Sequence, residues 1–161
     1  ILQPILIAGV LFHFIMGFYL EIQNRKAAKY EYQKEKGSAN STWMSRNMIT
    51  SGLVILAFLV LHFIDFWVPE MNYKYIEFLP EDPNRYYEEL VHKFENPLRV
   101  AMYCISFVLL ALHLLHGFTS SLRSMGTNKS YVSSAKTAGI VYSIGIPLGF
   151  CVIAIFHYLN H

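Results

Sequence analysis

The sequence predicts an all-α membrane protein, a transmembrane helical bundle with four spans in this chain. Of its 161 residues, 54% are hydrophobic and only 15% are charged, which is not the balance of a small soluble domain. The apolar residues gather in four runs, each long enough to approach the ~20 residues that a helix needs to cross ~30 Å of hydrocarbon. These runs cover about 1–22, 48–68, 98–122 and 137–159. We therefore expect a single transmembrane domain over residues 1–161.

The first run, Ile1–Ile22, is expected to be a span and not a cleaved signal peptide. It lacks a basic leader and a small-residue cleavage site, and it ends in charged residues. The chain also opens inside this run without a methionine. We therefore expect that an N-terminal part of the natural protein is missing from this sequence.

The charges predict the orientation of the chain. Nine of the thirteen Lys and Arg residues lie in the segments 23–47 and 123–136, whereas most acidic residues lie in the 69–97 connection. By the positive-inside rule, the two basic loops face the cytoplasm and the acidic connection faces outward.

The outer connection is expected to contain a short helix on the membrane surface, over about 83–95. Tyr87, Leu90, Val91 and Phe94 recur there at helical spacing. Asp82–Pro83 supplies a cap followed by proline at the first helical position.

Two further features mark the second and fourth spans. Asp65, near the outer end of the second span, is a candidate for proton handling, but a carboxylate that reaches the surface is the favoured interpretation. In the fourth span, Gly145 and Gly149 bracket Pro147, and small residues at this spacing predict a face where helices pack closely.

Four of the seven histidines, His13, His62, His113 and His116, fall within the spans. A polar ring there must face the bundle interior and find a partner, because lipid offers none. His13 lies ten residues before Gln23, and His113 lies ten before Arg123. At ~1.5 Å per residue, both rings are roughly 15 Å from the cytoplasmic boundary. We expect them at one depth.

Each of these two histidines is followed four positions later by a glycine, Gly17 or Gly117, on the same helix face. The glycine leaves a clearing in which a large planar ring fits. Two imidazoles at one depth on two helices predict bis-histidine ligation of a haem b. No Cys-x-x-Cys-His is present for a c-type haem, and the sulfur and carboxylate companions of a zinc or di-iron centre are missing.

The other two histidines leave alternatives open. His62 lies six residues before Val68, in the outer half of the membrane, so it is either a structural residue or a ligand whose partner belongs to the missing N-terminal part. His116 lies one turn closer to the cytoplasm than His113 and could replace it as a ligand, although its depth agrees less well with that of His13.

Three segments carry a resemblance to a known family: "LFHFIMGFYLEIQNRK", "TWMSRNMITSG" leading to "LVLHFIDFW", and "ALHLLHGFTSSLRSMG". They resemble the cytochrome b membrane anchor of bacterial succinate:quinone oxidoreductases of the di-haem type, which includes fumarate reductases. The resemblance covers nearly the whole chain and is closest to the Bacteroidetes b558 group.

The resemblance implies five transmembrane helices and two haems, with the first helix missing here. His13 and His113 would ligate the proximal haem, and His62 would be one ligand of the distal haem, whose other ligand is not in this sequence. At the cytoplasmic rim, Trp43, Arg46 and Arg123 are candidates to donate to haem propionates. Anchoring by positive charge and an aromatic belt is an equally good interpretation of these three residues.

The resemblance also implies the partners and the function. A flavoprotein subunit with FAD and an iron–sulfur subunit would dock on the cytoplasmic face of the bacterial inner membrane. Electrons would pass through haem b to a membrane quinone, with menaquinone expected, or in reverse for a quinol:fumarate reductase. The chain itself would be a non-catalytic electron-transfer subunit that binds lipid and no nucleic acid, in a complex that can form a homodimer.

Two rival functions remain open. One is a haem-free membrane scaffold or proton-relay subunit, and the other is a different b-type redox anchor, such as a hydrogenase or formate dehydrogenase cytochrome subunit. The spans contain no nucleophile–base set and no phosphate-binding loop, which excludes hydrolysis and group transfer.

Overall fold

The computed structural model describes residues 2–31, 47–124 and 129–160. These residues form helices joined by short turns and contain no strand, which confirms the all-α prediction. Four helical stretches are long and apolar enough to cross a membrane: Leu2–Lys26, Met48–Tyr75, Pro97–Leu122 and Ser133–Leu159. The four predicted spans are therefore confirmed, and the chain is a multi-pass membrane protein.

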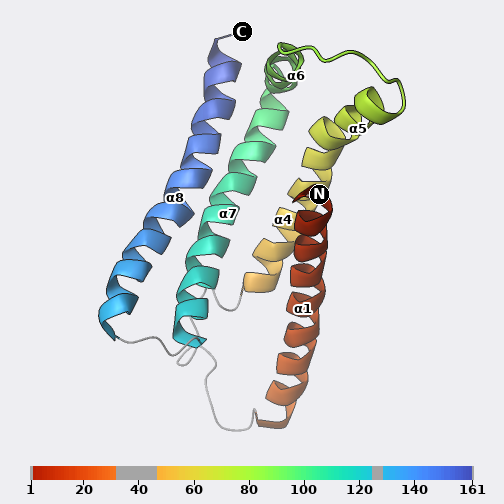
Figure 1. Cartoon of the computed structure of the whole chain (residues 1–161). Helices are drawn as coiled ribbons and strands as arrows, with labels where there is room; N and C mark the ends of the chain where they lie inside the picture. The colour runs from red at the N-terminus through yellow and green to blue at the C-terminus, as the bar shows by residue number, and fades with distance from the viewer. Residues whose placement is uncertain (1, 32–46, 125–128, 161) are drawn as a thin grey trace. The chain divides into compact units, whose positions relative to one another are not determined.

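The chain divides into two compact units, Ile1–Gly52 and Leu53–His161, and each is described by itself. The first unit contains α1 (Leu2–Glu31), the red helix of Figure 1. α1 continues well past the expected end of its span at Ile22 because the next residues are mostly Gln, Arg, Lys, Ala and Glu, which favour a helix. Within this extension the Arg25 Nε donates to Glu21 Oε1 at 2.7 Å.

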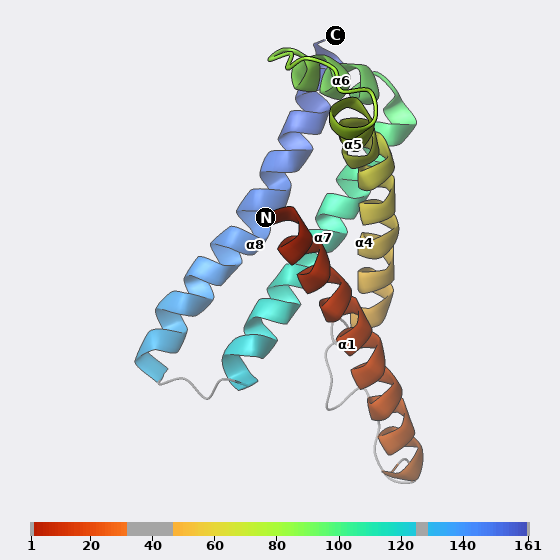
Figure 2. The same ribbon diagram turned by 45° about the vertical axis from the view of Figure 1, so that its right-hand side comes forward.

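A bent helix leads from the first unit into the second. It consists of α4 (Met48–His62), a π-helical turn η1 (Phe63–Trp67) and α5 (Val68–Tyr75). Pro69 lies in the first turn of α5, where its missing N–H is tolerated, so the helix continues beyond the expected end at Val68. Figure 2 shows α4 along its length but α5 almost end-on, so α5 turns away from the direction of α4. The proline and the π-helical turn are both recognised causes of such a bend.

The outer connection contains α6 (Arg85–Phe94), which begins two residues after the expected start at Pro83. The Asp82 carboxylate accepts a hydrogen bond from the Asn84 N–H at 2.9 Å, so Asp82 closes a turn before the helix and does not cap it. Arg85 then joins α6 to α5 through an ion pair to Glu70, and it pairs with Glu89 within α6.

Two long helices, α7 (Pro97–Ser124) and α8 (Lys129–Leu159), run side by side in Figures 1 and 2. The Asn96 side chain starts α7 by accepting the backbone N–H groups of Leu98 and Arg99, at 2.9 and 3.2 Å. α6 packs over the outer end of both helices. The buried core of the unit lies at this end, and its members come from α6, α7 and α8: Phe94, Val100, Tyr103, Phe107 and Ala154.

α7 and α8 approach each other closely at Gly139, where a Cβ atom would overlap the ring of Phe118. Gly145 and Gly149, the pair expected to mediate close packing, are exposed, and a Cβ at either would meet nothing within 4 Å among the described residues. The prediction of a packing face at Gly145 and Gly149 is therefore wrong for this part of the chain. Small-residue spacing identifies glycines that permit close approach but does not say which face a neighbour covers.

Replacement of Gly139 by Ala is expected to destabilise the α7–α8 pair by about 1–3 kcal/mol, because the new methyl group overpacks against the Phe118 ring. Gly145→Ala is the matched control: it faces open space and gains helix propensity, so its stability should not fall. Thermal unfolding in detergent, followed by circular dichroism, measures both. Equal melting temperatures for the two variants would contradict the assigned contact.

Candidate cofactor site

An apolar cavity of about 380 Å³ lies within the second unit, between α4, α7 and α8, with α6 at one end. Its walls are almost entirely phenylalanine rings and aliphatic side chains: Phe58, Phe66, Phe94, Phe107, Phe150, Leu59, Leu90, Leu110 and Ile153. Two polar side chains, His62 and Tyr103, complete the lining. A concave apolar site with a few polar groups is the usual form of a cofactor or small-molecule pocket.

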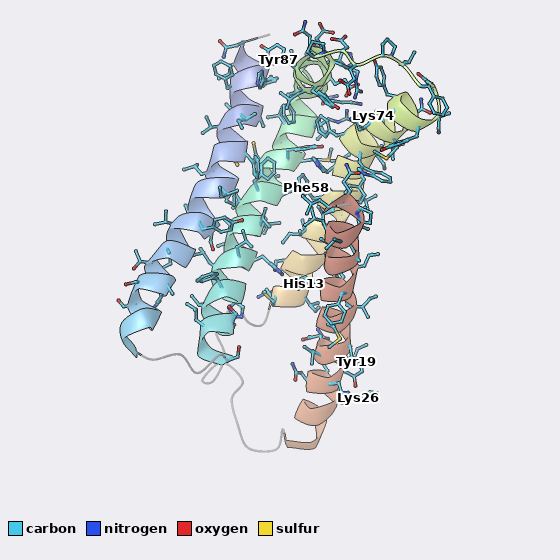
Figure 3. All side chains as sticks on the ribbon, viewed as in Figure 1. His13, Tyr19, Lys26, Phe58, Lys74 and Tyr87 are labelled. Atoms are coloured by element: carbon cyan, nitrogen blue, oxygen red, sulfur yellow. The ribbon has the colours of Figure 1, made fainter. Side chains whose placement is uncertain are left out.

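Aromatic rings hold α4 against α7 beside this cavity. The Phe58 ring meets Tyr103 edge-on at a centroid distance of 5.1 Å and Phe107 at 5.3 Å. Figure 3 places Phe58 between the two helices. Because these large rings lie between α4 and α7, they keep the two helix backbones apart, and the space beside the rings is the cavity.

His62, the last residue of α4, is half-buried on the cavity wall. Its ring lies between those of Phe58, at a centroid distance of 6.0 Å, and Phe66, at 5.3 Å, one helical turn before and after it. The two rings restrict the imidazole to a narrow range of orientations. An oriented imidazole facing an apolar space is the donor that haem iron takes from a protein.

Asp65, in the π-helical turn, is only 1% exposed. The Tyr103 hydroxyl donates to its Oδ2 atom at 3.0 Å, and the Arg99 guanidinium lies 3.4 Å from its Oδ1 atom. The Lys93 ammonium is 4.0 Å away. The favoured interpretation of Asp65 as a surface-seeking carboxylate is therefore wrong: a buried carboxylate persists only with such partners, and α6 and α7 supply them.

This ion-pair network lies beside the apolar cavity and shares one residue with it. Tyr103 belongs to both, since its hydroxyl binds Asp65 and its ring lines the apolar space. Arg99 and Lys93 remain partly exposed, so their charges reach the surface of the unit while the carboxylate stays buried. Tyr103 therefore connects the apolar space that His62 lines with a buried ion-pair network.

A larger cavity, of about 690 Å³, opens on the outer surface beside α5 and α6. Its lining is charged and aromatic, and includes Lys74, Arg85 and Tyr73. Lys74 and Arg85 are already paired with Glu70, and the Arg85 guanidinium stacks over the Tyr73 ring at 4.1 Å. Because it has no histidine and its cations are neutralised, this cavity is a poor site for a redox cofactor despite its size.

His13 lies on α1, in the first unit, and is exposed there. Its ring meets Phe14 edge-on at 6.0 Å. A Cβ added at Gly17 would meet nothing within 4 Å in the described part of its own unit, and the same holds for Gly9 on this helix, so the clearing expected beside His13 stays a prediction.

His113 and His116 are both half-buried on α7, in the second unit. The Ser120 hydroxyl lies 3.5 Å from His116 Nε2, a polar partner that α7 itself supplies. Gly117 follows His113 by four residues along the same helix. Because His13 and His113 belong to different units, their joint ligation of one haem stays a prediction, as does the choice of His113 over His116.

The residues predicted at the cytoplasmic rim are not placed. Trp43 and Arg46 lie outside the described residues. Arg123 falls in the last turn of α7, but its side chain also lies outside what the structure describes. Their contact with haem propionates therefore stays a prediction.

Sequence reasoning missed Tyr103 and Arg99 as members of the site. A signal for Arg99 was available: it follows Pro97 by two residues at the outer start of the third span, and Asp65 precedes Val68 by three at the outer end of the second. Opposite charges at the same depth on two spans predict an ion pair. The depth comparison is the one that grouped His13 with His113. Tyr103 carried no comparable signal, since a tyrosine near a span end is usually interfacial.

No group of three or more His, Cys, Asp or Glu side chains that could hold a metal ion occurs among the described residues. A site with one imidazole per helix does not require such a group, because haem iron is held mainly by its porphyrin and by axial ligands. Comparison of the chain with family models, with curated proteins and with solved structures gives no match.

The Asp65–Tyr103 hydrogen bond is expected to stabilise the second unit. The substitutions Asp65→Asn and Tyr103→Phe should each lower the free energy of unfolding by about 1–3 kcal/mol, because the remaining buried polar group then has a weaker partner or none. The double variant should lose roughly 0.5–3 kcal/mol less stability than the two single variants lose in total, because both substitutions remove the same hydrogen bond.

Unfolding of the four proteins in detergent, followed by circular dichroism, gives this coupling energy. Ser143→Ala serves as the control, because the buried Ser143 hydroxyl has no hydrogen-bond partner among the described residues and its loss should cost little. Strict additivity of the two site variants would mean that the hydrogen bond contributes nothing.

Proposed function

We propose that this chain is the haem b membrane anchor subunit of a succinate:quinone oxidoreductase, located in the bacterial inner membrane. The observation that carries the proposal is the His62 imidazole on the wall of an apolar cavity between transmembrane helices. Side chains on facing helices are the usual source of cofactor ligands in helical bundles. A bound haem would supply one-electron transfer at this position.

The surroundings of His62 suit this role. The rings of Phe58 and Phe66 flank the imidazole, and the pocket around it is lined almost entirely by apolar side chains. Burial and ligand orientation are two of the means by which a protein sets a haem potential. His62 would supply one axial ligand of the distal haem.

His13 and His113 are proposed to hold the proximal haem nearer the cytoplasm. Two features support this pair: the matched distance of each residue from the cytoplasmic end of its span, and the glycine four residues after each. The open space beside Gly17 fits the flat face of a large ring. Trp43, Arg46 and Arg123 are proposed as donors to the propionates.

Dicarboxylate chemistry is assigned to partner subunits. The spans offer no acid–base or nucleophile set for it, so a flavoprotein subunit and an iron–sulfur subunit would carry it and exchange electrons with this chain. The basic loops 23–47 and 123–136 would form their docking surface on the cytoplasmic side. The same arrangement serves succinate oxidation by a quinone, menaquinone being expected, and fumarate reduction by a quinol.

Purification of the complex from native membranes tests the assignment. We expect a reduced-minus-oxidised spectrum with the sharp α-band of bis-histidine haem b, and co-purification of a flavin-containing subunit and an iron–sulfur subunit. Flavin and iron–sulfur partners without any haem band would favour a haem-free anchor. A haem band with hydrogenase or formate dehydrogenase subunits would favour the other redox anchors.

Histidine variants test the ligands individually. Alanine at His13 or His113 should remove the proximal haem and lower the haem content per protein, and alanine at His62 should affect the distal haem separately. His116→Ala is the matched control on the same helix and should retain the haem content. The pyridine haemochrome assay measures haem per chain, and full retention after His113→Ala would contradict the ligand assignment.

A further inference from the structure

The two most exposed large apolar side chains of the described residues are Phe78, at 77%, and Ile76, at 71%. Neither belongs to a lipid-facing helix, because both follow the second span, which ends at Tyr75. Leu79 is exposed beside them. The turn formed by residues 75–79, called the apolar turn below, therefore carries two apolar side chains that are more exposed than any on the described membrane helices.

Polar groups in and next to the same turn are bonded to one another. The Glu77 N–H donates to the Asn72 carbonyl at 2.9 Å, and the Asn72 side-chain amide donates to the Glu77 carboxylate. The Leu79 N–H donates to the Tyr73 carbonyl at 3.2 Å, and the Tyr73 hydroxyl donates to the carbonyl of Pro80. Polar groups satisfied internally and apolar side chains directed outward are the reverse of the arrangement that water favours.

The backbone of the turn is strained at its most exposed residue. Phe78 adopts φ of 50°, in the left-handed region that residues other than Gly, Asn and Asp rarely occupy. Such a conformation persists only where surrounding interactions determine it. Here the hydrogen bonds on either side hold it, and its effect is to direct the phenyl ring away from the protein.

We propose that the apolar turn 75–79 is a lipid anchor that inserts into the interface of the outer leaflet. The bend between α4 and α5 makes this geometry available (Figure 1). A straight helix of 28 residues from Met48 to Tyr75 would be roughly 42 Å long at ~1.5 Å per residue and would lift the turn out of a hydrocarbon core of about 30 Å. Because α5 departs from the direction of α4, the turn stays near the membrane surface.

The flanking residues fit this depth. Tyr75 is 64% exposed, and tyrosine is favoured at the headgroup level, where one end of its ring is apolar and the other is wet. Glu81 and Asp82 follow, both exposed, and return the chain to water. The occupant of this surface is therefore lipid of the membrane that the chain already spans, and the proposal does not depend on haem.

Site-directed spin labelling tests the anchor. A nitroxide is placed at Ile76→Cys, and separately at Phe78→Cys, in the full chain with Cys104 and Cys151 replaced by Ser. The protein is reconstituted in vesicles of phosphatidylethanolamine and phosphatidylglycerol. A label at Glu81→Cys, five residues after Ile76 and in the same connection, is the matched control.

Collisional accessibility to oxygen, which concentrates in lipid, is compared with that to a water-soluble nickel chelate. The ratio of oxygen to nickel accessibility should be several-fold higher at positions 76 and 78 than at position 81. A ratio equal to that of the control would place the turn in water and overturn the proposal. Low accessibility to both reagents would mean that protein covers the turn, from a partner or a second copy, and would overturn it equally.

Discussion

The buried carboxylate of Asp65 is the constraint on which the arrangement of the second unit depends. A charge withdrawn from water in a membrane span must find partners, and its partners lie on α6 and α7. The Tyr103 hydroxyl and the Arg99 guanidinium therefore fix which face of α7 turns toward the second span. The orientation of α7 also brings Tyr103 and Phe107 against Phe58 and defines the wall opposite His62.

The π-helical turn explains how His62 and Asp65 can both face the protein interior. His62 ends the regular α4 helix, and the wider turn of η1 changes the angular positions of the residues that follow. Phe66, inside this turn, still contacts the His62 ring, while Asp65 is buried against α7. π-helical turns are frequent at functional sites, and here the turn contributes Phe66 to the apolar cavity and Asp65 to the ion-pair network.

The sequence was sufficient to predict the four spans because hydropathy depends only on the local residues. It placed the helix ends less well. α1 continues beyond Ile22 because helix-forming residues follow, and α5 continues beyond Val68 because Pro69 lies in its first turn, where it does not interrupt the helix. Depth along a span can be counted from the sequence, whereas rotation about the helix axis depends on the neighbours. For this reason the depth of His62 in the outer half of the membrane was predicted, but the cavity that it lines was not. For the same reason Asp65 was expected to reach water. The same limit explains why close packing was assigned to Gly145 and not to Gly139.

The bend of the second span links the interior of the unit to its outer surface. In a straight helix, Asp65 would keep the angular position that regular α-helical geometry gives it, and the residues after Tyr75 would lie farther from the membrane. With η1 and Pro69 present, the Asp65 carboxylate faces α7, and α5 bends away from the direction of α4. An ion pair between Arg85 of α6 and Glu70 of α5 holds α5 in this position. The chain that follows can then direct Phe78 and Ile76 outward at the membrane surface. The burial of Asp65 and the position of the proposed lipid anchor therefore depend on the same bend.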